Sequence, residues 1–86
     1  MMLLGKFRIQ GSSMIPTFKT GDLVLVSRIS YFFKNPKIND IVVTKNKLIK
    51  RIVREKRGKY FLRGDDGREV GWVIKSDIIG KVIHKL

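Results

Sequence analysis

The sequence predicts a small, mostly β protein, a strongly curved β-fold of about six strands with almost no helix. Its apolar segments are short, rich in β-branched residues and separated by turn residues. Within them, apolar residues alternate with polar ones or form runs of about four, which is too short for a buried helix. The chain has only 86 residues, so we expect one domain covering 1–86.

Each expected element has a local reason. Residues 6–10 alternate polar and apolar side chains, which is typical of a strand with one buried face. Residues 11–21 contain glycines, serines and Pro16, which predict a loop. A continuous apolar run at 23–26 predicts a strand buried on both faces. Further strands are expected at 41–44, 47–54, 60–62, 72–74 and 81–83, with turns at 45–46, 55–58 and 64–67, and one helical turn at 76–79 that Ser76 would cap.

The segment 47–54 is ambiguous. Its apolar residues Leu48, Ile49, Ile52 and Val53 fit helical spacing as well as a strand. Its β-branched content and the turns on both sides favour the strand.

Composition excludes several kinds of site. There is no cysteine, so disulfides, thiolate zinc sites and cysteine nucleophiles are ruled out. The single histidine, His84, leaves little room for a histidine-metal cluster. We therefore expect neither a metal nor another cofactor. Apolar residues make up 43% of the chain, which is too many for a disordered basic tail.

The chain carries 19 basic and 7 acidic residues, a formal charge of +12. The densest basic cluster, 45–59, is interleaved with aliphatic residues, and this arrangement favours solvated strand faces. No zinc finger, aromatic RNA-binding signature or glycine-rich phosphate loop accompanies the charge. Nucleic acid is therefore not an expected partner.

No apolar stretch is long enough for a secretory signal or a membrane-spanning helix. The most lipid-compatible patch is Tyr31, Phe32 and Phe33, with Arg28 before it and Lys34 after it. Aromatic residues beside basic ones suit peripheral contact with a membrane, and they suit a loop that buries its aromatics in the core equally well. The expected location is the cytoplasm or the periphery of a membrane.

Without cysteine, and with histidine only at the end of the chain, a hydrolase would need another base. Lysine can serve when burial lowers its pKa from about 10.4 toward neutrality. In a strand at 47–54, Lys50 shares a face with Leu48 and Ile52. Ser13, in the expected loop, could present its hydroxyl and its backbone N–H together. From the residues alone, an ordinary loop serine and a strand lysine reaching water are the favoured interpretation, and a Ser-Lys pair is only permitted.

Five ordered segments between residues 11 and 82 resemble the signature of type I signal peptidases. The first corresponds to the family's G-x-S-M-x-P-T…G-D-x-V-x-V signature, at 11–17 and 21–26. The other four correspond to its G-D-I-V-V, I-K-R-V, V-x-G-D-N and I-x-G-x-V motifs, at 39–43, 48–53, 61–66 and 78–82, with Asn39 in place of the usual glycine and Asp66 in place of the usual asparagine.

This resemblance implies a LexA and signal-peptidase-like β-fold with a Ser-Lys catalytic dyad. Ser13 would attack the scissile carbonyl, its backbone N–H would contribute to the oxyanion hole, and Lys50 would be the general base. The substrate would be a precursor polypeptide, cleaved in its N-terminal region after small residues. Residues expected to support the site are Met14, Pro16, Asp22, Arg51, Gly64 and Asp65.

The family's S-x-D-S-R stretch has no counterpart between Asp66 and Gly71. In this respect the chain is most similar to short members of the family, such as the nickel superoxide dismutase maturation proteases. Two alternatives stay open. One is a LexA-like domain that cleaves itself. The other is an inactive module that binds a peptide along a sheet edge or an anionic surface through its charge.

Overall fold

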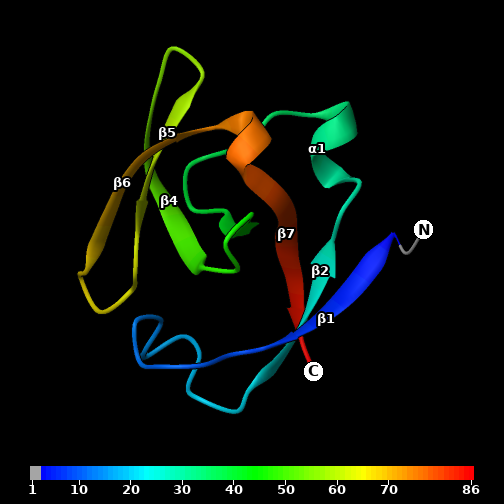
Figure 1. The fold of residues 1–86 in the computed structure, drawn as a ribbon, viewed down its shortest axis with the longest axis vertical. Helices are drawn as coiled ribbons and strands as arrows, with labels where there is room; N and C mark the ends of the chain where they lie inside the picture. The colour runs from blue at the N-terminus through cyan, green and yellow to red at the C-terminus, as the bar shows by residue number, and fades with distance from the viewer. Residues whose placement is uncertain (1–2) are drawn as a thin grey trace.

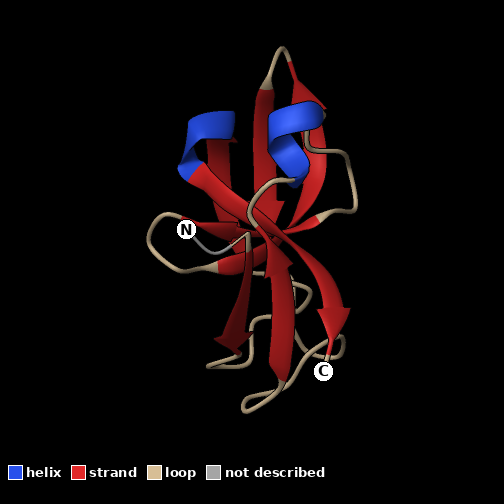
Figure 2. Ribbon diagram, turned by 90° about the vertical axis from the view of Figure 1, so that its right-hand side faces the viewer, coloured by secondary structure: helices blue, strands red, loops and turns tan. Residues whose placement is uncertain are grey.

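The computed structural model describes residues 3–86, and within them a single antiparallel sheet contains nearly all the regular structure (Figure 1). Its seven strands have the spatial order β1-β2-β7-β3-β4-β5-β6. The strands are β1 (Leu4–Arg8), β2 (Leu23–Ser27), β3 (Ile41–Thr44), β4 (Ile49–Lys56), β5 (Lys59–Arg63), β6 (Glu69–Ile74) and β7 (Ile78–Lys85). Two short helices are added, α1 (Ser30–Phe33) and a 3₁₀ turn (Lys75–Asp77), and both lie at one end of the sheet (Figure 2). Met1 and Met2, the start of the chain, lie outside the described residues.

The last strand joins the two halves of the sheet, because β7 lies between β2 and β3. This insertion requires glycine at position 80. A Cβ atom there would lie 2.5 Å from Val26 Cγ1 and 2.8 Å from the Ser27 carbonyl oxygen. The backbones of β2 and β7 can therefore approach each other only where one side chain is missing.

The sheet curls so that both faces of its centre are buried. Val42 and Val43 are consecutive residues of β3, so their side chains point to opposite faces, and both are completely buried. The Val43 side packs with a cluster that includes Met14 and Phe18 of the loop after β1. The Val42 side packs with a second cluster that includes Tyr31 and Ile52. The curvature thus divides the core into two parts on either side of β3.

The expected fold class is confirmed: the protein is mostly β with little helix. The number of strands is seven, which equals the number of expected segments and is one above the approximate total of six. The ambiguous segment is a strand. The turn at Arg57 and Gly58 has positive φ at both residues, 52° and 78°, as a tight two-residue hairpin requires.

One local expectation is wrong. Ser76 does not cap a helical turn: the turn spans Lys75–Asp77, and the Asp77 carboxylate accepts a hydrogen bond from the Ile74 N–H at 3.1 Å. For residues 31–33, both a membrane contact and burial in the core were left open, and the structure divides them: Tyr31 lies in the core. Its side chain is buried, and its hydroxyl donates a hydrogen bond to Asp40 at 2.7 Å. Phe32 and Phe33 remain exposed.

Within residues 3–86, neither helix has the length and apolar character needed to cross a bilayer.

Adding a methyl group at Gly80 is expected to destabilise the fold, because it would overlap both a core side chain and the backbone of β2. We expect Gly80→Ala to lower the free energy of unfolding by roughly 1–3 kcal/mol, as overpacking of a core does, measured by urea unfolding. The matched control is Gly5→Ala, where the nearest atom to a new Cβ would be 3.6 Å away. Equal unfolding midpoints for the two variants would contradict this account of β7.

Candidate active site

The loop that carries Ser13 is fixed at its base and along its length. Ile9 and Gly21 close the base, where the Gly21 N–H donates to the Ile9 carbonyl at 2.9 Å. Met14 and Phe18 anchor the loop in the core with 2% and 6% of their surface exposed, and the Phe18 N–H donates to the Met14 carbonyl at 2.8 Å. Ser13 lies directly before Met14, so the buried side chain of Met14 fixes the position of the serine.

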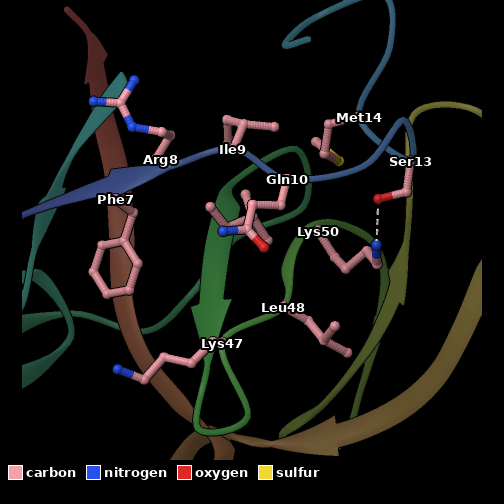
Figure 3. Close-up of a pocket in the computed structure, with 10 residues that line it drawn as sticks. Phe7, Arg8, Ile9, Gln10, Ser13, Met14, Lys47, Leu48 and Lys50 are labelled. Carbon is pink, nitrogen blue, oxygen red and sulfur yellow. Dashed lines mark hydrogen bonds between the residues drawn. The ribbon is translucent and has the colours of Figure 1, made fainter. Parts of the chain in front are cut away.

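The sheet positions Lys50 opposite this loop. Lys50 lies near the start of β4, beside Val42 of β3, and only 9% of its surface is exposed. Its Nζ atom lies 2.5 Å from Ser13 Oγ (Figure 3). The structure thus joins two residues that are 37 positions apart in the chain.

Burial lowers the pKa of Lys50, since desolvation disfavours the charged ammonium. The negative charge of Asp66 opposes this effect, and the positive charge of Arg68 adds to it. Asp66 and Arg68 also form an ion pair with each other at 3.0 Å. The Lys50 amine is therefore neutral at a lower pH than an ordinary lysine, as a general base needs to be.

The turn between β5 and β6 packs directly against Ser13. The Asp66 N–H donates to the Ser13 carbonyl at 3.0 Å. A Cβ atom on Gly64 would lie 2.5 Å from that carbonyl oxygen and 3.1 Å from Ser13 Cβ. Only glycine therefore allows this turn to support the serine so closely.

An ion pair connects this turn to the strand that carries Lys50. Arg51, the next residue of β4, donates from Nε and Nη2 to the two carboxylate oxygens of Asp65, at 2.8 and 2.9 Å. The Thr17 hydroxyl of the serine loop also donates to Asp65. The hydrogen bonds from Arg51 hold the pKa of Asp65 below its usual value. Three separate segments therefore meet at one carboxylate.

Two other residues expected to support the site, Asp22 and Pro16, belong to the serine loop and its end. Asp22 accepts a hydrogen bond from the Lys19 N–H at 3.0 Å, which is the main reason that its pKa is lowered, and it lies 3.3 Å from Lys85 of β7. It thus closes the end of the loop. Pro16 is exposed and follows a cis peptide bond from Ile15.

A hollow of about 320 Å³ lies beside Ser13 and Lys50 (Figure 3). It is bordered by the end of β1 and by the segment that leads into β4, where Lys47 has a positive φ of 68°. Its lining residues are Phe7, Arg8, Ile9, Gln10, Ser13, Met14, Lys47, Leu48, Ile49 and Lys50. Leu48 was expected inside the strand; it precedes β4 but still lies in the wall beside Lys50.

Sequence reasoning missed the roles of Asp66 and Arg68 around Lys50. The segment was expected to be a simple turn, and it is one, with the Gly67 N–H donating to the Gly64 carbonyl at 2.9 Å. The spacing of an acidic and a basic residue across Gly67 could have suggested their ion pair. Its proximity to Lys50 depends on contacts between strands.

Residues 1–55 match the family described as signal peptidase, peptidase S26. The match covers the serine loop and β4 up to Glu55, and therefore includes both Ser13 and Lys50. No solved structure gave a match.

Individual relatives match over a shorter segment. A probable thylakoidal processing peptidase 2, chloroplastic, of Arabidopsis thaliana is 46% identical over 37 residues, which is 43% of this chain and 10% of the relative. Signal peptidase I of Buchnera aphidicola subsp. Baizongia pistaciae (strain Bp) has the same identity over the same length, which is 12% of that protein. The aligned segment thus spans about a tenth of each relative.

The ion pair between Arg51 and Asp65 is expected to stabilise the protein in a pH-dependent way. Replacing Asp65 with asparagine should lower the free energy of unfolding by roughly 1–3 kcal/mol at neutral pH, the range for hydrogen bonds to charged groups. Because the folded-state pKa of Asp65 is lowered, its contribution is complete above the ordinary value of about 3.9 and is lost as the pH falls through the lowered pKa. Urea unfolding of wild type and Asp65→Asn across this range measures the difference.

The exposed carboxylate Glu69 provides a control for that measurement, since Glu69→Gln removes a charge from the surface near the same turn. A stability difference between wild type and Asp65→Asn that stays constant down to strongly acidic pH would show that the carboxylate is not stabilised by its partners.

Proposed function

Because this chain belongs to the signal peptidase family, peptidase S26, we propose that it is a serine endopeptidase that uses Ser13 as nucleophile and Lys50 as general base. The substrate is a precursor polypeptide, cleaved in its N-terminal region after small residues. The observation that carries the proposal is the 2.5 Å separation of Ser13 Oγ from the buried Lys50 Nζ.

The proposed reaction begins with neutral Lys50 removing the proton from the Ser13 hydroxyl while Ser13 Oγ attacks the scissile carbonyl carbon. The carbonyl oxygen becomes an oxyanion, and the Ser13 backbone N–H is proposed as one of its donors. Protonated Lys50 then transfers the proton to the leaving amine, and an acyl group remains on Ser13. Water, activated in turn by Lys50, releases the second product.

The hollow beside the pair supports an extended substrate. On one side, β1 is an edge strand of the sheet, so an extended peptide in the hollow could pair with its free backbone. On the other side, Leu48 already bonds to Thr44 through its backbone N–H and its carbonyl, so this wall offers side-chain contacts. Phe7, Ile9 and Leu48 contribute apolar side chains to its walls. An extended peptide lying there would pass Ser13 at one end of the hollow (Figure 3).

The first prediction from this proposal is cleavage that depends on both members of the pair. Purified protein should cleave peptides with small residues before the cut, and Ser13→Ala and Lys50→Met should each reduce the rate by at least about a thousandfold, as loss of a nucleophile or its base does. Mass spectrometry of the products measures the rate and identifies the cut.

Matched controls are available on the same elements. Ser12→Ala removes the neighbouring serine hydroxyl, and Lys56→Met removes an exposed lysine from the same strand. Both variants should cleave at the wild-type rate. Full activity in Lys50→Met would refute the Ser-Lys mechanism. A folded wild-type protein that cleaves no peptide at any pH would favour the inactive binding module, and cleavage of its own chain alone would favour the LexA-like alternative.

The second prediction concerns pH. Activity requires neutral Lys50, so the rate should rise with pH and level off below about 10.4, because the pKa of Lys50 is lowered from that ordinary value. The positive charge of Arg68 contributes to the lowering. Arg68→Gln should therefore move the rise to higher pH, whereas Asp66→Asn should move it to lower pH.

The control for these shifts is Arg28→Gln, which removes one positive charge from an exposed position in the segment between β2 and α1. It should leave the pH profile in place. Profiles that move equally in Arg28→Gln and Arg68→Gln would indicate a general effect of net charge and would contradict a local effect at Lys50.

A further inference from the structure

Two consecutive phenylalanines project from α1 into solvent. The exposed fraction is 72% for Phe32 and 85% for Phe33. Such exposure is unusual for adjacent large aromatic residues, because each loses the free energy that burial would supply. Neither residue belongs to the two core clusters, so the fold itself does not explain them.

The helix that carries them is firmly held. Tyr31, the residue before them, is 7% exposed and bonds to Asp40 through its hydroxyl. Ser30 donates to the Ser27 hydroxyl at 2.8 Å. These contacts of Tyr31 and Ser30 fix the turn. Because Tyr31 points into the core, Phe32 and Phe33 point into solvent.

Basic side chains surround this pair. Arg28 and Lys75 line a shared hollow together with Phe32, and Lys34 follows Phe33 directly. Lys75 also bonds to the Asn35 side chain at 3.3 Å, which keeps its charge beside the segment after α1. We refer to Phe32, Phe33, Arg28, Lys34 and Lys75 as the aromatic-basic patch.

The acidic residues near the patch are already engaged. Asp40 accepts hydrogen bonds from the Tyr31 hydroxyl and the Lys37 N–H, and it lies 3.6 Å from Lys81. Asp77 accepts from the Ile74 N–H. The three basic residues of the patch, together with Lys81, outnumber these two carboxylates. The patch therefore presents apolar rings within a net positive charge, a combination that matches the boundary between the headgroups and acyl chains of an anionic membrane.

We propose that the aromatic-basic patch docks the protein on anionic lipid bilayers, with Phe32 and Phe33 inserted at the level of the headgroups. A short turn with two rings suits shallow insertion. A membrane combines a shallow apolar contact with charge attraction, and two exposed rings beside basic side chains offer both.

Docking at this patch would turn the Ser13 loop away from the bilayer. The end of the molecule with α1 lies opposite the end with residues 11–21 along the longest axis (Figure 1), and the second view shows both helices together at one end (Figure 2). A substrate segment would therefore have to reach the hollow from the aqueous side. Peptide cleavage, where present, should continue on vesicles.

The test is sedimentation of the whole chain with vesicles. We expect it to bind vesicles made of equal parts phosphatidylcholine and phosphatidylglycerol and not to bind phosphatidylcholine alone. Phe32→Ser/Phe33→Ser should weaken binding at least about tenfold. Lys34→Gln/Lys75→Gln should weaken it roughly thirtyfold at low salt, since each basic residue near such a surface contributes about a fivefold factor.

A matched pair of lysines separates the patch from the net charge of +12. Lys6→Gln/Lys19→Gln removes the same charge from exposed positions on β1 and on the loop of residues 11–21, toward the end opposite α1 (Figure 1), and should change binding much less. Equal losses in the two lysine pairs, or undiminished binding of the phenylalanine variant, would overturn the proposal. So would a wild-type dimer that Phe32→Ser/Phe33→Ser converts to a monomer, since a second copy would then cover the patch. Repeating the binding with Ser13→Ala keeps this result independent of peptidase activity.

Discussion

The ion pair of Arg51 with Asp65 is the contact on which the geometry of the candidate site depends. Arg51 follows Lys50 on β4, and Asp65 follows Gly64 in the turn that supports Ser13. Through Thr17, the same carboxylate also bonds to the serine loop. A two-oxygen contact to a guanidinium fixes both distance and orientation. Strand, turn and loop therefore keep one mutual arrangement, although they come from distant parts of the chain.

The position of Lys50 has opposing consequences. Burying an amine disfavours its charged form and therefore reduces stability at any pH where the free lysine would be protonated. The same burial makes the amine available to accept a proton. Asp66 and Arg68 place a carboxylate and a guanidinium near Lys50 that act in opposite directions on its pKa, and the two are bonded to each other. The turn thus supports Ser13 through its backbone and influences Lys50 through its charges.

The two ends of the molecule have different surface chemistry. At one end, the loop of residues 11–21 and the hollow beside it combine buried anchors with a serine and a lysine in contact. At the other, α1 uses Tyr31 and Ser30 to hold Phe32 and Phe33 outward among basic residues. The curved sheet connects these ends through β7, whose passage beside β2 depends on the missing side chain of Gly80. Catalysis and docking, as proposed, would therefore occupy separate surfaces of one small sheet.

Much of this protein follows from local sequence patterns. Alternating and β-branched segments predicted the strands, and turn residues such as Arg57 and Gly58 predicted the hairpin, because these preferences act between neighbouring residues. The motifs around Ser13 and Lys50 predicted their pairing, and the structure places them in contact; their catalytic roles remain predictions. The order of strands, the burial of Tyr31, the outward position of Phe32 and Phe33, and the effect of Asp66 and Arg68 on Lys50 were decided only by the tertiary structure. Each depends on contacts between residues far apart in the chain, and no local preference specifies which distant segments will meet.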